Sequence, residues 1–251
     1  MSTELVVAII AGIVAFVSAA GTIWSSIRNA ERSDANARAI AQLKFESDRL
    51  KLAAQREQEI ANFKEPLARA AYDLQSRIFN ILKLNVVDVY FTNGSDREKK
   101  YIVDNTAFLV AQYMCWTEMV RREIQFIDLG SSEKTHELLS LQDRIFSAWA
   151  TDEPKSKIFR IFAGEQRAIG EALISIGPRG PECIGYGAFL TTFTEGSNPL
   201  IDDLRADVIS LGRNLDQGKE RLTNLQHAFI DLLKMLDPNY LRFPEKSRTK
   251  V

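Results

Sequence analysis

Apolar residues open the chain in one unbroken block. From Leu5 to Trp24 there are 20 residues without a charged side chain. A helix rises about 1.5 Å per residue, so this block as a helix measures about 30 Å, the thickness of the hydrocarbon core of a bilayer. Trp24 falls where an interfacial aromatic residue is expected. The pattern therefore predicts a transmembrane anchor over residues 1–24.

Two other interpretations of this block are less well supported. A cleaved signal peptide needs a basic start and a shorter apolar run, whereas here Glu4 is the charged residue before the block. The small residues Ser18, Ala19 and Ala20 do imitate a cleavage site. A buried helix of a soluble core would show a polar face, and the block has none.

Basic residues after the block predict its orientation. Arg28, Arg32, Arg38 and Lys44 follow within 20 residues of Trp24, and no Lys or Arg precedes the block. The positive-inside rule places the amino terminus outside and the rest of the chain in the cytosol, at a plasma or inner membrane. The glycosylation sequon Asn93-Gly94-Ser95 would then be inert, and we interpret it as a turn.

Residues 25–65 have the composition of a helical stalk. They contain no proline or glycine, and seven basic and six acidic residues alternate between Arg28 and Phe63. Leu43 and Leu50 are seven residues apart, which gives a weak coiled-coil tendency that does not persist. A single solvated helix and a self-associating one are equally compatible with this pattern.

Helical stripes fill residues 66–238. Pro66 is predicted to end the stalk and to begin a new helix at its first turn. Apolar residues then recur at steps of three and four in four further stretches, with a helix also expected over 159–176. The stripes cover 67–81 (extending toward Val89), 102–127, 138–149 and 208–236. We predict an all-α bundle of five or six helices.

The last stripe, 208–236, is predicted to be one helix at the coiled-coil period. Its flanking positions lack acidic partners, which favours a helix within a bundle over an exposed zipper. Gly212 and Gly218 indicate either close helix approach or a break. After it, residues 239–251 carry Arg242, Lys246, Arg248 and Lys250 and are predicted to form a basic, flexible tail.

The amino-acid composition limits the kinds of ligand and cofactor that the chain is expected to bind. The 251 residues include 32 Lys and Arg against 33 Asp and Glu, so no basic excess favours nucleic acid. Two cysteines, Cys115 and Cys183, and two histidines are too few for a disulfide framework or a zinc cluster. We therefore expect no metal, no cofactor and no catalytic residue, although an enzyme is not excluded.

One segment departs from the helical pattern. Residues 177–187 hold four of the 13 glycines and two of the seven prolines. Glycine-rich loops expose backbone N–H groups to ligands, and Arg179, Glu182, Cys183 and Tyr186 are the candidate ligand-binding residues. A plain connection between helices is the favoured alternative, since no phosphate-binding or dinucleotide motif follows.

These observations lead to three functional hypotheses. The first is a single-pass membrane protein whose cytosolic helical domain acts as an interaction, scaffold, sensor or adaptor subunit, with a protein partner or a second copy. The second is a membrane-bound enzyme or small-ligand receptor that uses residues 177–187. An oligomeric channel ranks lower, because Gly12 and Gly21 do not form a Gly-x-x-x-Gly pair.

Overall fold

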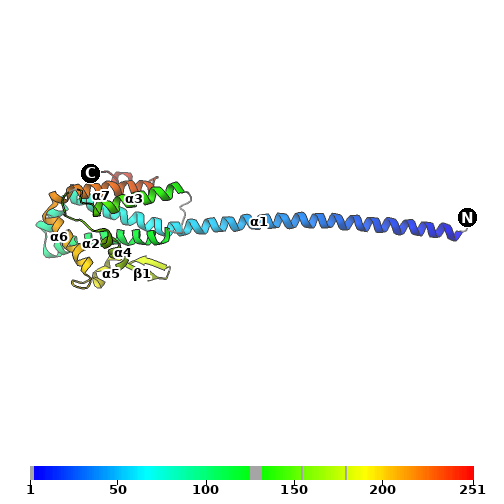
Figure 1. The fold of residues 1–251 in the computed structure, drawn as a ribbon, viewed down its shortest axis with the longest axis horizontal. Coiled ribbons are helices and arrows are strands. Elements are labelled where there is room, and N and C mark those ends of the chain that lie inside the picture. The colour runs from blue at the N-terminus through cyan, green and yellow to red at the C-terminus, as the bar shows by residue number, and fades with distance from the viewer. Residues whose placement is uncertain (1–2, 125–131, 154, 179) are drawn as a thin grey trace. The chain divides into compact units, whose positions relative to one another are not determined.

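The computed structural model describes residues 3–124, 132–153, 155–178 and 180–251, without the side chains of residues 3–11, 30, 31, 34, 35, 56–61, 123, 124 and 132. The described residues are mostly helical, as the predicted all-α class requires (Figure 1). They divide into two compact units, Met1–Glu57 and Gln58–Val251.

The first unit consists of residues of helix α1 (Thr3–Lys83), whose last turns belong to the second unit. The described side chains from Gly12 to Gln55 are exposed, large apolar ones included. In the part of the chain that the structure describes, no helix has the length and apolar composition needed to cross a bilayer. Residues 5–11, the first seven of the uncharged block Leu5–Trp24, lie outside the described side chains.

The predicted helix boundary at Pro66 is wrong, because α1 runs through this proline. A proline inside a helix cannot donate the usual hydrogen bond and costs about 3 kcal/mol. The turns after it are held by tertiary contacts: Leu67 and Ala70 are buried, and Tyr72 stacks on Phe243 with ring centroids 4.4 Å apart. Packing after the proline outweighs the local penalty.

Helices α2 and α3 follow the predicted stripes. Ser95 precedes α2, and Glu98 accepts hydrogen bonds from the Ser95 N–H and hydroxyl at 2.8 and 2.6 Å, which completes a capping box. Residues 125–127 of the predicted second stripe lie outside the described residues. The bounds are α2 (Asp96–Ile124), α3 (Ser132–Ala150), α4 (Ala163–Ala172), α5 (Tyr186–Thr192), α6 (Pro199–Arg213) and α7 (Leu215–Leu236).

The first predicted stripe does not continue toward Val89 as an α-helix. Helix α1 ends at Lys83, and Asn85 adopts a left-handed conformation with φ of 51°. Asparagine is among the few residues that accept this conformation. The chain then forms a short π-helix, η1 (Val87–Thr92), which carries Val89.

The predicted helix over 159–176 is present as α4 over residues 163–172, but both ends of the predicted range have other structure. Helix α4 ends at Ala172, and β1 (Ile174–Gly177) pairs antiparallel with β2 (Gly180–Cys183). Gly180, with φ of 107°, supplies a backbone conformation at the turn that glycine accepts readily. The strands contain proline and three glycine or serine positions, so their composition carries no β signal.

The predicted helix over 208–236 is divided at Asn214 into α6 and α7. The Asn214 side chain donates to the Ser210 carbonyl at 3.0 Å, and such a local bond competes with helix continuation.

Both glycines near this break mark close approaches between elements. A Cβ atom at Gly212 would lie 2.8 Å from the Phe91 ring. A Cβ atom at Gly218 would lie 2.4 Å from the Leu211 side chain. Each distance is shorter than a normal carbon contact, so only glycine fits without displacement of the neighbour.

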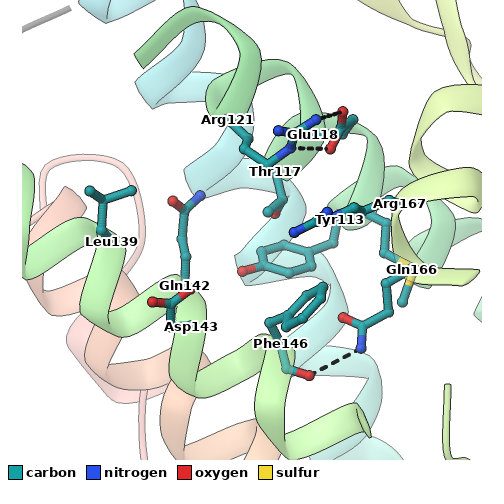
Figure 2. A pocket seen from close by; sticks show the side chains of 11 residues that line it. Tyr113, Thr117, Glu118, Arg121, Leu139, Gln142, Asp143, Phe146, Gln166 and Arg167 are labelled. Atoms are coloured by element: carbon teal, nitrogen blue, oxygen red, sulfur yellow. Dashed lines mark hydrogen bonds and ion pairs between the residues drawn. The ribbon is translucent and has the colours of Figure 1, made fainter. Parts of the chain in front are cut away.

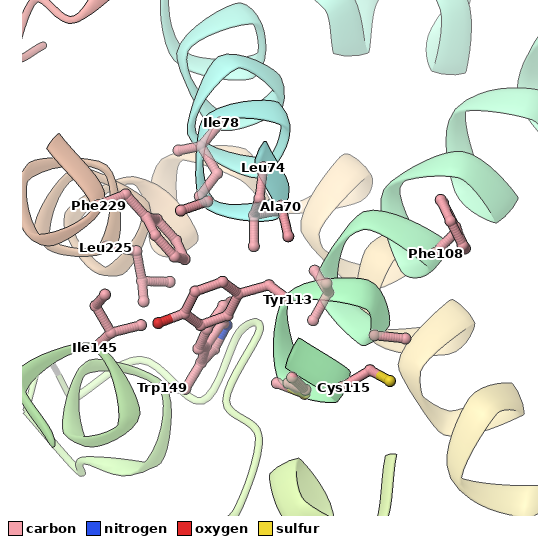
Figure 3. Close-up of a cluster of buried hydrophobic side chains, with 14 of the residues drawn as sticks. Ala70, Leu74, Ile78, Phe108, Tyr113, Cys115, Ile145, Trp149, Leu225 and Phe229 are labelled. Carbon is pink, nitrogen blue, oxygen red and sulfur yellow. The ribbon is translucent and has the colours of Figure 1, made fainter. Parts of the chain in front are cut away.

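The core of the second unit lies where α1, α2, α3 and α7 meet (Figure 3). Tyr113 of α2 is central to it: its ring meets Phe229 of α7 edge to face, with centroids 4.7 Å apart. Trp149 of α3 packs against both rings, at 6.1 and 5.8 Å. Leu74 and Ile78 of α1 are buried beside them.

A buried arginine organises the segment between α3 and α4. Arg221 of α7 is 1% exposed, and its guanidinium donates to four carbonyls at 2.7 to 3.1 Å, those of Ala148, Trp149, Thr151 and Ser156. Burial lowers the pKa of Arg221, and Arg160 adds to this effect. Ala148 and Trp149 lie in the last turn of α3, and Thr151 and Ser156 in the irregular segment after it, so this side chain supplies donors to carbonyls at the helix end and beyond it.

The segment predicted to be a flexible tail, 239–251, packs on the second unit. Phe243 and Arg248 are buried, and Arg248 forms an ion pair with Asp237 and donates to the Phe243 carbonyl at 2.7 Å. The carboxylate of Asp237 also accepts from the Phe243 N–H at 3.1 Å. A charged residue that is paired and hydrogen-bonded in this way can be buried, which its sequence position did not indicate.

We expect Gly170→Ala to destabilise the second unit. A Cβ atom at Gly170 would lie 2.6 Å from the Met114 carbonyl oxygen of α2, and relief of such a clash costs about 1–3 kcal/mol. Gly164→Ala is the matched control in the same helix, because a Cβ atom there meets nothing within 4 Å. Urea unfolding of the full chain in mild detergent, followed by tryptophan fluorescence, measures both. Equal stability of the two variants would contradict the close α2–α4 contact.

Candidate functional site

The three candidate residues that the structure describes, Glu182, Cys183 and Tyr186, do not come together in one site. Arg179 lies outside the described residues. Glu182 is exposed, and its carboxylate lies across Gly177 on the neighbouring strand. Cys183 and Tyr186 instead turn toward α2, where they contact different residues.

Cys183 lies beside the other cysteine of the chain. Its thiol lies near that of Cys115, which is buried in α2, and donates to the Ile184 carbonyl at 3.6 Å; both thiols are free. The hydrogen bond with Cys183, and then burial, raise the pKa of Cys115. Because the thiolate is the reactive form, Cys115 is inert at neutral pH, whereas Cys183 is partly exposed.

Tyr186 serves as a packing residue at the start of α5. Its ring lies 5.3 Å from that of Phe108 in α2, which in turn lies 5.5 Å from Phe189. Burial raises the pKa of Tyr186, and the nearby Asp104 carboxylate adds to the shift. A neutral phenol that fills an aromatic cluster accounts for this residue without a ligand.

A wide groove of about 1040 Å³ lies between α2 and α6. At its floor Asp104 accepts hydrogen bonds from Arg205 at 2.8 Å and forms an ion pair with Lys100 at 3.0 Å. Arg205 also donates to the Phe193 carbonyl at 2.6 Å. These charged groups satisfy one another, so the groove floor offers no unpaired charge among them.

A smaller cavity between α2, α3 and α4 has a different character (Figure 2). Its volume is about 120 Å³. Apolar side chains of Met114, Leu139 and Phe146 form part of its wall. The remaining lining residues are polar or charged: Tyr113, Thr117, Glu118, Arg121, Gln142, Asp143, Gln166 and Arg167.

Three buried polar atoms at this cavity make no hydrogen bond of normal geometry within the described structure: Tyr113 Oη, Thr117 Oγ1 and Gln142 Nε2. An unsatisfied buried donor or acceptor costs about 1–3 kcal/mol. Burial raises the pKa of Tyr113, and the nearby Thr117 hydroxyl opposes part of this shift. Tyr113 is therefore a neutral phenol throughout the physiological range.

The charged rim of the cavity is internally paired. Glu118 is buried and accepts from Arg121 at 2.6 and 2.7 Å and from Arg122 at 2.8 Å. Burial alone would raise the pKa of Glu118, but the hydrogen bonds from the two arginines outweigh it and lower the pKa. Arg122 also pairs with Glu171 of α4 at 2.6 Å, which ties α2 to α4.

An acidic cluster lies elsewhere, on the contact between α4 and α6. Burial raises the pKa of Asp207 to about 6, and the carboxylates of Glu165 and Asp203 add to this effect. Within the described ranges, no three His, Cys, Asp or Glu side chains are arranged to hold a metal ion.

Comparison of the chain with protein-family models, curated proteins and solved structures gives no match. The functional interpretation of this chain therefore depends on its own residues.

Sequence reasoning missed the cavity, although a signal was present. Tyr113, Thr117 and Arg121 recur every four residues, and so form a polar ridge on α2 beside the apolar stripe. Gln142 likewise follows Leu141 inside the stripe of α3. A polar ridge alone is typical of a solvated helix face, so only the packing of three helices reveals that it is enclosed.

We expect N-ethylmaleimide to modify Cys183 faster than Cys115 in the folded protein. Cys183 is partly exposed, whereas Cys115 is fully buried with a raised pKa. Peptide mass spectrometry at pH 7 over a time course measures both rates, and the urea-unfolded chain is the control in which the rates converge. Equal rates in the native protein would contradict the burial of Cys115.

We expect Asp207→Asn to stabilise the protein at pH 7. The folded-state pKa lies above the unfolded value of 3.8, so folding favours the protonated acid, and stability falls as pH rises from about 4 through 6. The gain at pH 7 is about 1 kcal/mol, since partial exposure screens the shift. The stability difference between Asp207→Asn and wild type should vanish near pH 4. Asp203→Asn, an exposed neighbour, is the control with a smaller effect.

Proposed function

We propose that this protein is a single-pass membrane protein whose cytosolic helical domain acts as a sensor or adaptor subunit. The observation that carries the proposal is the apolar, uncharged character of residues 5–24. Where side chains of this block are described, large apolar groups are exposed on the helix: Ile13, Val14, Phe16, Val17, Ile23 and Trp24. Exposure of so much contiguous apolar surface to water is unfavourable, and a bilayer removes that cost.

The residues after the block support an interfacial position. Arg28 lies over the Trp24 ring, with its guanidinium carbon 4.9 Å from the ring centroid. Trp and Arg are both favoured at the boundary between hydrocarbon and water. Three further basic residues, Arg32, Arg38 and Lys44, favour a cytosolic location for the stalk and the helical domain.

The stalk supports an interaction role. Ile40, Leu43, Phe45, Leu50 and Leu52 are 50 to 69% exposed in the monomer. The seven-residue spacing of Leu43 and Leu50, and of Phe45 and Leu52, matches a helical partner or a second copy of the chain. The adaptor function is therefore assigned to the stalk together with the helical domain. The use of 177–187 as a ligand loop, and a channel, remain alternatives.

Membrane integration is tested by lysine substitution at matched positions. Phe16→Lys with Val17→Lys adds two charges to the proposed span, each costing about 2.5–3.5 kcal/mol at the centre of a bilayer. We expect this variant to be extracted by alkaline carbonate, while wild type stays in the membrane pellet. Leu43→Lys with Phe45→Lys, on exposed stalk residues, is the control and should remain integrated. Extraction of wild type itself would contradict the anchor.

The chain carries its own orientation reporter. Asn93 is exposed and heads the sequon Asn93-Gly94-Ser95, so it accepts a glycan only if the domain enters the lumen. When wild type is translated in the presence of microsomes, we expect endoglycosidase treatment to leave its electrophoretic mobility unchanged. Replacement of Arg28, Arg32 and Arg38 by Ala, with Ser2→Lys and Thr3→Lys, reverses the charge bias and should produce a glycosylated species.

Asn93→Gln in that reversed variant is the control that removes the glycan. A glycosylated wild type would show that the domain lies on the opposite side of the membrane from the one proposed.

A further inference from the structure

We propose that the cavity between α2, α3 and α4 binds a small neutral molecule that joins a ring-sized apolar body to a hydroxyl group. The residues that define the site are Tyr113, Thr117 and Gln142, with Met114, Leu139 and Phe146. The proposal is independent of the membrane anchor, because every residue of the cavity lies in the second unit.

The polar part of the ligand follows from the unsatisfied atoms. Gln142 Nε2 only donates, while the hydroxyls of Tyr113 and Thr117 donate or accept. A single group that meets all three is a hydroxyl, which accepts two hydrogen bonds through its lone pairs and donates its own hydrogen in the third. Tyr113 and Gln142 are 3 and 8% exposed, so a group that meets their polar atoms must enter the cavity.

The apolar part follows from size and lining. A cavity of about 120 Å³ is somewhat smaller than the 150 Å³ apolar cavity known to accept benzene, so it suits a single ring or a short branched chain. Met114 and Phe146 provide carbon contacts for such a body. A purely polar occupant would leave this wall without partners.

The neutral character follows from the charges around the site. Two acidic residues, Glu118 and Asp143, and two basic ones, Arg121 and Arg167, line the cavity. Glu118 is saturated by its two arginines, and Arg167 lies over the Phe146 ring at 5.8 Å. Asp143 and Arg167 are exposed at the mouth with opposite charges, so the lining as a whole has no net charge that would favour an ion over a neutral ligand.

Access to the site is from the α3 side. Leu139 is 42% exposed, and Asp143 and Arg167 are exposed as well, so the mouth of the cavity meets solvent. The ligand therefore enters without opening of the core, and its ring would pass between flexible side chains.

The test uses 4-fluorophenol and fluorobenzene as probes, observed by ¹⁹F NMR with the full chain in phospholipid nanodiscs and with empty nanodiscs subtracted. We expect saturable binding of 4-fluorophenol that is about tenfold tighter than that of fluorobenzene, the effect of one satisfied hydrogen-bond group. In the double variant Thr117→Val with Gln142→Leu, the affinity for 4-fluorophenol should fall to that for fluorobenzene. The affinity for fluorobenzene itself should change little. Thr191→Val, on α5, is the control.

Two results would overturn the proposal. Equal affinity of wild type for the two probes would show an apolar cavity without polar recognition. No saturable binding of either probe would show a site filled by water alone. If the double variant does not fold, Tyr113→Phe is the second test, because it removes one hydroxyl from the site. It should lower the affinity for 4-fluorophenol and leave the affinity for fluorobenzene unchanged.

Discussion

Buried guanidinium groups bonded to main-chain carbonyls hold the irregular parts of the second unit in place. Arg221 does this for the segment between α3 and α4, Arg248 for the C-terminal segment, and Arg205 for the segment before α6. The carbonyls concerned, such as those of Ala148, Phe243 and Phe193, lie at helix ends or in irregular chain, where regular secondary structure does not supply a donor. The planar, five-donor head of arginine can serve several carbonyls at once, so a few side chains fix a large share of the non-helical chain.

The contact between Phe243 and α1 explains two features that the sequence pattern did not reveal together. Tyr72 stacks on Phe243, and Arg69 lies over the same ring at 4.8 Å, immediately after Pro66. The C-terminal segment thus supports the part of α1 where proline weakens the helix. Helices α2 and α3 were predictable because their apolar stripes report burial directly, whereas the continuity through Pro66 depends on a partner about 177 residues away.

The candidate site was less predictable than the fold for a related reason. Periodicity assigns a residue to a helix face but not to the neighbour that covers this face. Thr117 and Gln142 look like ordinary boundary residues until α2 and α3 are placed side by side, and the Cys115–Cys183 pair needs the hairpin to fold back on α2. The hairpin itself has short strands with Gly180 and Pro181, so neither propensity nor alternation identified it.

The contacts across the cavity differ between its α2–α4 side and its α2–α3 side, and the proposed sensor role would use this difference. On one side, α2 and α4 meet so closely that Gly170 admits no side chain, and Arg122 pairs with Glu171 across them. On the other side, Tyr113 and Thr117 of α2 face Gln142 of α3 without a hydrogen bond of normal geometry. A ligand shifts a conformational equilibrium only by its difference in affinity between two states. An occupant that bonds to both α2 and α3 favours the state in which these helices lie at bonding distance. In the proposed site, ligand occupancy would be coupled to the α2–α3 contact, and Tyr113 also packs against Phe229 of α7.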